Sequence, residues 1–402
     1  MKPTRVVLAA AGAALAAGTL TAPAAHAATA VPCSATALID AINDANANGG
    51  DTLVLASGCT YDLTAADNDE NGLPVITTPI TIVGSNTTIA RNASATDQFR
   101  IFEVGDGGRL SLQRLTIRGG DTTGEGGGIL TSTGGNLRLA DVTVTENTSA
   151  ADGGGAKITE DATATIANST FSNNDAGDEG GGLSNDGTTT LGTTTLNNNN
   201  ADNYGGGLDS DDETLTASRT TIRNNETGEG SAGVDSDGGT VTISNSNISD
   251  NTTIGTFAAG IYNDADSMTL NTTIVRDNTS TGDGSEGGGI YNTSPLTLRN
   301  STVTGNSLPG ANGQGGGIYS DDGPVSLISS RVTGNNATGA GGIYNDSAPL
   351  SLISSRVTGN NATIAPGGLY TDVPITFTSS AITGNIPTNC TGSPVIPPGC
   401  NN

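Results

Sequence analysis

Apolar and polar positions recur along this 402-residue chain with a period of 25 to 29 residues between Gly126 and Asn385. In each of ten units a Gly stands directly before an apolar residue, a polar turn follows, and a short β-rich stretch ends in Asn. A fixed period of this length is typical of solenoids. The apolar residues after the Gly are Ile129, Ala156, Leu183, Leu208, Val234, Ile261, Ile290, Ile318, Ile343 and Leu369.

Three further columns keep the same period. A second apolar column consists of Val144, Phe171, Leu196, Ile222, Ile248, Val275, Val303, Val332, Val357 and Ile382. A third lies five residues earlier, at Leu139, Ile166, Leu191, Ala217, Ile243, Leu270, Leu298, Leu327, Leu352 and Phe377. The last column is Asn, at 147, 174, 199, 225, 251, 278, 306, 335, 360 and 385.

These columns predict an all-β chain folded as a parallel β-helix of about ten to twelve coils. Apolar side chains that alternate with Thr, Ser and Arg point inward, and stacked strands pair with those above and below. We expect Gly where a bend leaves no room for a Cβ atom. We expect Asn at sharp corners, in the left-handed backbone conformation and with stacked amides that hydrogen-bond to one another.

The two ends of the chain differ from the repeats. Ser34 to Asn48 has the apolar spacing of an amphipathic helix, with Ser34 or Thr36 as N-cap, and we expect it to cover the open edge of the first coil. Residues 28–97 are thus predicted to form this cap and irregular first coils, 98–385 the repeats, and 386–402 a C-terminal cap. Pro394, Pro397 and Pro398 in this tail cannot extend a sheet.

Residues 1–27 have the features of a secretory signal peptide. Lys2 and Arg5 precede an apolar run, and Ala25-His26-Ala27 fits a cleavage site. No other segment is apolar enough to cross a membrane. We therefore expect a secreted, extracellular protein without a membrane span once the signal is removed.

Loss of this leader changes the chemistry that the chain can perform. His26 is the only His, so the exported chain has no His for acid–base catalysis or metal binding, and its net charge falls from −25 to −27. Nucleic-acid binding, which depends on basic patches, is excluded on this ground. The same charge favours solubility and repulsion between copies, and we expect a monomer.

Four Cys in an exported chain indicate two disulfides. Cys33 and Cys59 lie before the repeats, and Cys390 and Cys400 lie after them. Four Cys allow three pairings. We expect Cys33–Cys59 and Cys390–Cys400, because the repeats separate the two groups.

The repeat units resemble known ones. Gly287-Gly288-Gly289-Ile290 with Asn300-Ser301-Thr302-Val303-Thr304-Gly305-Asn306 is similar to the repeats of polymorphic outer-membrane proteins. More broadly, 126–385 resembles the secreted β-helix proteins of the pectate-lyase-like superfamily. The resemblance implies right-handed coiling. It leaves the activity open, because this fold carries lyases, hydrolases, adhesins and passive surface proteins.

Two outward columns are candidate binding features. Asp stands three residues after the first apolar column in seven units, at Asp186, Asp211, Asp237, Asp264, Asp321, Asp346 and Asp372. These carboxylates either cap turns, the interpretation that we favour, or bind Ca²⁺, although no cofactor is required. Tyr directly follows the apolar residue in the last five units, at Tyr262, Tyr291, Tyr319, Tyr344 and Tyr370. These rings form either a self-supporting ladder or a stripe that binds carbohydrate or protein.

The irregular parts of the repeat decide between functions. Thr279–Gly288 and Ser307–Gly316 are long excursions of the kind that forms binding loops in solenoids. If the chain were a polysaccharide lyase, Arg219, Arg223 and Arg276 would be the candidate bases implied by the superfamily. A glycosidase would need paired carboxylates, and no pair stands out in the sequence. We favour a non-catalytic, adhesin-like binding or scaffold protein whose partner is an extracellular polysaccharide or surface protein. The alternative is a lyase or glycosidase that acts on acidic polysaccharide.

Overall fold

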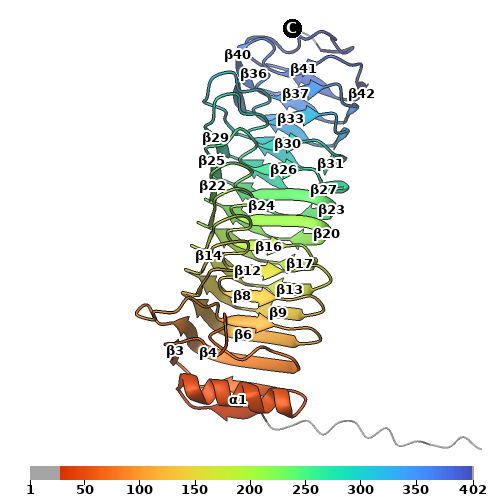
Figure 1. The fold of residues 1–402 in the computed structure, drawn as a ribbon. Coiled ribbons are helices and arrows are strands. Elements are labelled where there is room, and N and C mark those ends of the chain that lie inside the picture. The colour runs from red at the N-terminus through yellow and green to blue at the C-terminus, as the bar shows by residue number, and fades with distance from the viewer. Residues whose placement is uncertain (1–27, 401–402) are drawn as a thin grey trace, which may run out of the picture.

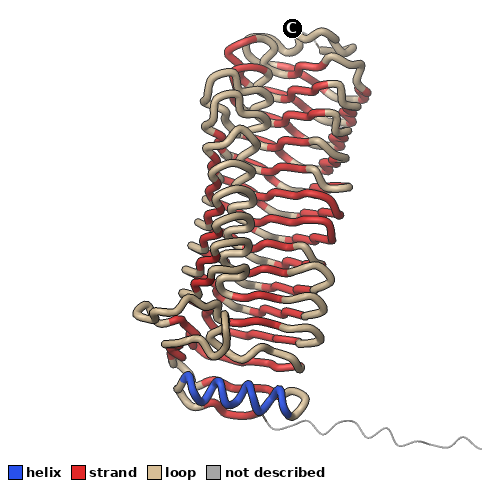
Figure 2. The backbone as a smooth tube through the Cα atoms, viewed as in Figure 1, coloured by secondary structure: helices blue, strands red, loops and turns tan. Residues whose placement is uncertain are grey.

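The computed structural model describes residues 28–400, which form an elongated parallel β-solenoid of about 13 turns (Figure 1). The predicted parallel β-helix is thereby confirmed. The turns exceed the expected ten to twelve because β2 (Asp51–Leu55) and β4 (Pro79–Arg91), in the irregular N-terminal part, already pair in register with the stack. Short strands alternate with loops around each turn (Figure 2).

The strands form three faces, all paired in parallel, and a few long strands continue from one face into the next. The first face consists of β5 (Phe102–Val104), β8 (Ile129–Thr131), β12 (Ala156–Ile158), β16 (Leu183–Asn185), the start of β20 (Leu208–Ser218) and of β23 (Val234–Ser244), β26 (Ile261–Asn263), β30 (Ile290–Asn292), β33 (Ile318–Asp321), β37 (Ile343–Asp346) and β41 (Leu369–Thr371). The second consists of β1 (Thr29–Val31), β2, the starts of β4 and β6 (Arg109–Arg118), β9 (Asn136–Ala140), β13 (Thr163–Ala167), β17 (Thr188–Gly192), the ends of β20 and β23, β27 (Ser267–Asn271), β31 (Leu296–Arg299), β34 (Val325–Ile328), β38 (Leu350–Ile353) and β42 (Thr376–Thr378).

The third face holds the second apolar column of the sequence. Its strands are β3 (Thr60–Leu63), the ends of β4 and β6, β10 (Thr143–Thr145), β14 (Thr170–Ser172), β18 (Thr195–Asn197), β21 (Thr221–Arg223), β24 (Asn247–Ser249), β28 (Ile274–Arg276), β32 (Thr302–Thr304), β35 (Arg331–Thr333), β39 (Arg356–Thr358) and β43 (Ala381–Thr383). Short strands follow this face, in one sheet of seven and one of two: β7 (Asp121–Thr122), β11 (Thr148–Ser149), β15 (Asp175–Ala176), β19 (Asn200–Ala201), β22 (Glu226–Thr227), β25 (Thr252–Thr253), β29 (Thr279–Ser280), β36 (Asn336–Gly339) and β40 (Asn361–Ile364).

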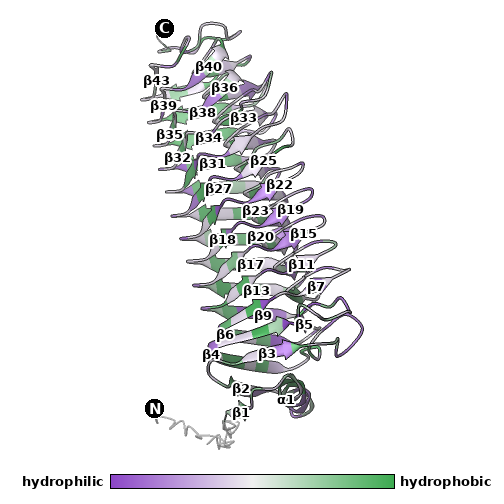
Figure 3. Ribbon diagram, turned by 90° about the vertical axis from the view of Figure 1, so that its left-hand side faces the viewer, coloured by the Kyte–Doolittle hydropathy of each residue, from purple (hydrophilic) through white to green (hydrophobic). Residues whose placement is uncertain are grey.

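The interior of the solenoid is a continuous apolar core. Ile129, Leu139 and Val144 each have 0% of their surface exposed, and their counterparts in the following coils are buried with one exception, Phe377. Hydrophobic segments consequently recur from strand to strand along the stack (Figure 3). Because burial is repeated in every coil, the core stabilises the rod along its whole length.

The Asn column forms a hydrogen-bonded ladder inside the corner after the third face. Asn225, for example, accepts bonds from the backbone N–H and the side-chain amide of Asn199 at 3.0 and 3.1 Å, and donates to Asn251 Oδ1 at 3.0 Å. Its amide also donates to the carbonyl of Leu196 at 3.2 Å. The left-handed conformation expected for Asn is found instead at the preceding residue, such as Asn224 with φ 52°. The turn is therefore made one residue earlier, which leaves the Asn side chain free to bond inside the corner.

The Gly before the first apolar column is required by this ladder. A Cβ atom on Gly207 would lie 2.7 Å from Asn225 Nδ2 and 2.8 Å from the carbonyl oxygen of Gly233. Any side chain at this position would displace the amide or the backbone of the neighbouring coil. Gly and Asn are thus two halves of one packing arrangement.

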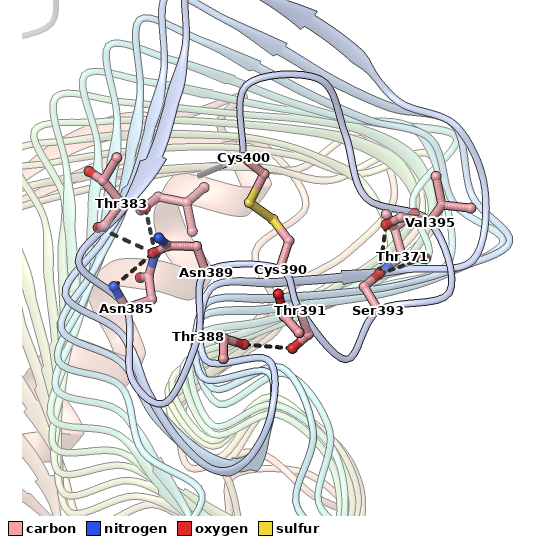
Figure 4. Close-up of a disulfide and its surroundings, with 11 residues drawn as sticks. Thr371, Thr383, Asn385, Thr388, Asn389, Cys390, Thr391, Ser393, Val395 and Cys400 are labelled. Atoms are coloured by element: carbon pink, nitrogen blue, oxygen red, sulfur yellow. Dashed lines mark hydrogen bonds between the residues drawn. A yellow bond between two sulfur atoms is a disulfide. The ribbon is translucent and has the colours of Figure 1, made fainter. Parts of the chain in front are cut away.

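Both ends of the rod are closed. Helix α1 (Ala35–Ala47) begins after the N-cap Ser34 and buries Leu38 and Ile42. It covers the N-terminal end of the rod (Figure 1), and a disulfide joins Cys33, just before the helix, to Cys59. At the other end Cys390 is joined to Cys400, and Asn389 Oδ1 accepts two bonds from Asn385, which terminates the ladder (Figure 4). The expected disulfides are both present. Within residues 28–400 no helix has the length and apolar character needed to span a membrane.

Candidate functional site

The first face carries one outward column whose chemistry changes along the rod. The residue directly after the Gly-apolar pair is Leu130, Lys157, Ser184, Asp209 and Asp235 in five successive coils, and Tyr in the remaining five. Strand register places each of these beside the next, so Asp209 lies opposite Asp235 on adjacent strands, roughly 4.8 Å apart. Two carboxylates are therefore forced together on the outer face of the sheet.

These two carboxylates form part of an acidic pocket of about 250 Å³. We use this name for the pocket lined by Glu179, Tyr204, Asp209, Asp211, Asp235, Asp237, Phe257 and Tyr262. Carboxylate oxygens of Glu179, Asp209 and Asp211 lie within 4.8 Å of one another. Asp209 and Asp235 are only 2% and 5% exposed. The carboxylates thus meet in a hollow that the rings of Tyr204, Phe257 and Tyr262 also line.

Burial and mutual repulsion favour the protonated forms of these acids. Burial, together with the charges of Asp211, Asp152 and Asp178, raises the pKa of Glu179 to about 7. Burial raises the pKa of Asp235 to about 8, against the lowering effect of a bond from the backbone N–H of Ser231 at 3.0 Å. Burial and the charges of Asp186 and Asp237 raise the pKa of Asp211 to about 6, and that of Asp209 is raised by burial as well. The pocket therefore contains both protonated and ionised carboxyl groups near neutral pH.

Lys157 supplies a positive charge at the N-terminal side of the pocket. Its Nζ contacts Asp186 at 2.7 Å and Asp152 at 3.0 Å, and it donates to Ser184 Oγ at 3.1 Å. Ser184 Oγ in turn donates to Asp209 at 3.1 Å. Burial lowers the pKa of the Lys157 ammonium, but the bonds and charges of Asp186 and Asp152 outweigh this effect and raise it. Lys157 is consequently a fixed cation that steadies one side of the carboxylate cluster.

The seven Asp residues predicted from the sequence have different surroundings. Asp186 is paired with Lys157, and Asp211 belongs to the cluster with ligand spacing. Asp264 accepts from the hydroxyls of Thr293 and Ser294 at 2.7 and 2.9 Å, and Asp372 accepts from the backbone N–H of Ser347 at 2.8 Å. Asp237 is one of the residues that line the acidic pocket. Asp321 and Asp346 lie opposite each other on the adjacent strands β33 and β37. Oxygen atoms of the kind that Ca²⁺ prefers are thus gathered at Asp211, together with Glu179 and Asp209, which the sequence did not single out.

The five Tyr rings stack on one another along the first face. Centroids from Tyr262 to Tyr344 are 5.3, 5.3 and 5.1 Å apart, and those of Tyr344 and Tyr370 are 4.2 Å apart, all within 9° of parallel. Phe257 packs edge-on against Tyr262 and Tyr291. Because each inner ring has a neighbour on both faces, its edge and hydroxyl are the parts left for contact with a ligand. The stripe remains a predicted binding surface.

The candidate bases of a lyase do not join the acidic pocket. Arg219 lies in the turn between the second and third faces and donates to Thr193 Oγ1 at 3.2 Å. Arg223 is exposed on β21, and Arg276 on β28 bonds Asn247 and Asp277 at 3.1 and 2.7 Å. All three belong to the third face or its corner, whereas the pocket lies on the first.

Sequence reasoning missed Lys157, Glu179, Asp209 and Asp235. The signal was present in the column that contains the Tyr stripe, since its earlier members are charged where the later ones are aromatic. Following that column through all ten units would have placed Asp209 beside Asp235. Glu179 and Tyr204 both stand four residues before the apolar residue of their coils, so a second column supplies the opposite wall.

No family model matches the chain, and no curated protein matches it. Among solved structures, the chain is similar to the A-modules of two mannuronan C-5 epimerases of Azotobacter vinelandii. The AlgE6 module is 15% identical with a TM-score of 0.41, and the alignment covers 90% of this chain and 95% of that one. The AlgE4 module is 14% identical with a TM-score of 0.42, covering 82% and 95%. Similarity at this level assigns no function, and none of these matches supports the resemblance to polymorphic outer-membrane proteins.

Proposed function

We propose that this protein is an exported polysaccharide-acting protein that holds a glycan along its first face and hydrolyses it in the acidic pocket. The observation that carries the proposal is the meeting of Glu179, Asp209 and Asp211 in one hollow beside Tyr204, Phe257 and Tyr262. Glycoside hydrolysis needs two carboxyl groups in different protonation states, and a separation near 5 Å corresponds to a retaining mechanism.

The pKa values suggest the division of roles. Between about pH 6 and 7, Glu179 keeps its proton while Asp211 is largely ionised, so Glu179 would protonate the leaving oxygen while Asp211 displaces it at the anomeric carbon and forms a glycosyl ester. The ionised Glu179 would then take a proton from a water molecule that attacks this ester, which releases the sugar and restores both carboxyl groups. Besides burial, the charges of Asp152 and Asp178 raise the pKa of Glu179, and those of Asp186 and Asp237 raise the pKa of Asp211. The ammonium of Lys157 acts against both increases. The rate should rise as Asp211 ionises and fall as Glu179 loses its proton, giving an optimum between about pH 6 and 7.

The charge of the pocket indicates the class of substrate. Among the described residues, the only ammonium in or beside the pocket is that of Lys157, and seven carboxyl groups lie there with it: Asp152, Glu179, Asp186, Asp209, Asp211, Asp235 and Asp237. A polyanion would meet like charge along this face, which disfavours the acidic polysaccharide expected from the sequence. A neutral or amino-sugar polysaccharide is the substrate that we propose.

Release of new reducing ends from a panel of neutral, amino-sugar and acidic polysaccharides tests the proposal. Glu179→Gln and Asp211→Asn should each reduce hydrolysis by roughly 10²- to 10⁴-fold. Asp212→Asn, which removes an exposed carboxylate one residue from Asp211, is the matched control and should leave the rate unchanged. Hydrolysis that survives both pocket variants, or no hydrolysis of any polymer, would contradict a catalytic role.

Non-catalytic binding is the second candidate, and the continuous Tyr stack favours it. The exported adhesin-like or scaffold protein favoured by the sequence would retain a glycan on this face without releasing products. Glycan retention by a catalytically silent protein would support this candidate, and unsaturated products would instead indicate a lyase. Export itself rests on the leader at residues 1–27, which lies outside the described residues, and on the two disulfides.

A further inference from the structure

A second pocket, of about 200 Å³, lies at the C-terminal end of the Tyr stack. Its lining includes Asn312, Gln314, Thr338, Tyr344, Ile364 and Tyr370. It arises from a gap in a column of side chains that borders the stack in the preceding coils. We call it the stack-end pocket.

The bordering column stands four residues before the first apolar column. Phe257 occupies it in one coil and packs against the rings of Tyr262 and Tyr291, with centroids 5.5 and 5.4 Å away. Glu286 follows, then Gln314, and register pairs Gln314 with Gly339 and Gly339 with Ile364. Gly339 thus interrupts the column with no side chain, beside Tyr344 and Tyr370.

The space at Gly339 is open. A Cβ atom built there would have its nearest neighbour, Gln314 Cγ, at 3.8 Å, which is ordinary contact distance. Two coils before the gap Glu286 borders the stack, and three coils before it Phe257 does. A ligand in the stack-end pocket would therefore occupy the place that Phe257 fills against the earlier rings.

We propose that the stack-end pocket binds one uncharged pyranose unit of a glycan. The apolar surface that a sugar ring would cover is formed by Ile364, Ala365, Pro366 and the edges of Tyr344 and Tyr370. Hydrogen-bonding groups for the hydroxyls of the sugar are the amides of Asn312 and Gln314 and the hydroxyl of Thr338. No Asp, Glu, Lys or Arg lines the pocket. The volume is below that of pockets for drug-sized ligands, which suits a single ring.

This site extends the proposed function but does not depend on catalysis. Asp235 and Tyr344 are four coils apart on the same column, roughly 19 Å. A glycan held at the stack-end pocket would run along the Tyr hydroxyls toward the acidic pocket. The assignment rests on the proposed function only in taking a glycan as the ligand.

Saturation-transfer NMR on the full exported chain tests the site, with methyl glucopyranoside, galactopyranoside and mannopyranoside as probes. At least one should bind with a millimolar Kd, and the corresponding methyl uronides should bind at least tenfold more weakly because Asp321 and Asp346 lie near the stack. Gly339→Phe, which places in the gap the ring that Phe257 supplies elsewhere, should raise the Kd at least tenfold. Gly192→Phe, at a Gly on the second face with no atom within 4 Å of its Cβ, is the matched control.

Gln314→Ala removes an amide without filling the pocket and should weaken pyranoside binding severalfold. If Gly339→Phe fails to fold, Gly339→Gln is used in its place. Absence of binding by all three neutral pyranosides, or binding that persists unchanged in Gly339→Phe, would overturn the proposal. Glu179→Gln should leave pyranoside binding unchanged. Loss of hydrolysis with intact pyranoside binding, or the reverse, therefore separates failure of the proposed function from failure of this site.

Discussion

Asp235→Asn should stabilise the protein at neutral pH, although it removes a charged group from an acidic chain. Asp235 is 5% exposed, and burial raises the pKa of its carboxyl to about 8. The unfolded chain binds this proton only below about pH 4. Between pH 4 and 8 the folded state therefore holds more protons, and stability falls as pH rises through this range.

The magnitude follows from the two pKa values. At pH 7, keeping a proton on a group whose unfolded pKa is near 3.9 costs up to about 4 kcal/mol, at about 1.4 kcal/mol for each pKa unit. Asn has the same shape, keeps an acceptor for the backbone N–H of Ser231, and offers an amide to the neighbouring Asp209. We expect Asp235→Asn to raise the free energy of unfolding by about 2–4 kcal/mol at pH 7 and by less than about 0.5 kcal/mol at pH 4.

Urea unfolding followed by circular dichroism at pH 4, 5.5 and 7 measures this difference. Asp322→Asn is the control, because Asp322 is an exposed aspartate of a later coil whose replacement should change the free energy of unfolding by less than about 0.5 kcal/mol. Equal effects of Asp235→Asn at pH 4 and pH 7, or a loss of stability at pH 7, would refute the reasoning. If millimolar Ca²⁺ stabilises the unsubstituted protein at pH 7 and EDTA reverses this, a cation rather than a proton offsets the carboxylates.

Two further predictions concern the packing of the corner. Asn225→Ala should lower the free energy of unfolding by about 3–5 kcal/mol in urea unfolding, because four hydrogen bonds are lost and their buried partners are left unsatisfied; an effect below about 1 kcal/mol would contradict the ladder. Gly207→Ala should lower the free energy of unfolding by about 1–3 kcal/mol in thermal unfolding, because its Cβ would lie 2.7 Å from Asn225 Nδ2. The control Gly192→Ala should change the free energy of unfolding by less than about 0.5 kcal/mol, and equal melting temperatures of the two variants would argue against the clash.

The period of the sequence was sufficient to predict the fold, because burial and pairing repeat identically in every coil. Ile129, Leu139 and Val144 occupy the inward positions that their columns indicated. The conformation of the corner was assigned one residue too late, since a sequence shows that Asn recurs but not whether Asn224 or Asn225 carries the positive φ. Both predicted disulfides followed from the separation of the Cys pairs by the rod.

The candidate site was harder to predict because it depends on register. Asp209 and Asp235 are 26 residues apart in the sequence, and each is unremarkable alone. Parallel pairing brings them to neighbouring strands, and the wall containing Glu179 comes from a different part of the coil. Arg219 and Arg223, two of the candidate lyase bases, follow Asp211 closely in the sequence, yet the intervening turns carry them away to the corner and strand of the third face.

The first face therefore shows where requirements other than folding act on the repeat. The three inward columns that the sequence showed vary only among apolar residues, and the Gly and Asn of the corner hardly vary, because each change would cost stability in two adjacent coils. The outward column is free of these constraints, and Ser184 shows that a small neutral residue fits within it. Placing Asp209 and Asp235 there instead raises both pKa values and costs stability at neutral pH. Such a cost at two adjacent strands, beside Glu179 and at the start of the Tyr stack, is the pattern expected of a functional site rather than of a scaffold alone.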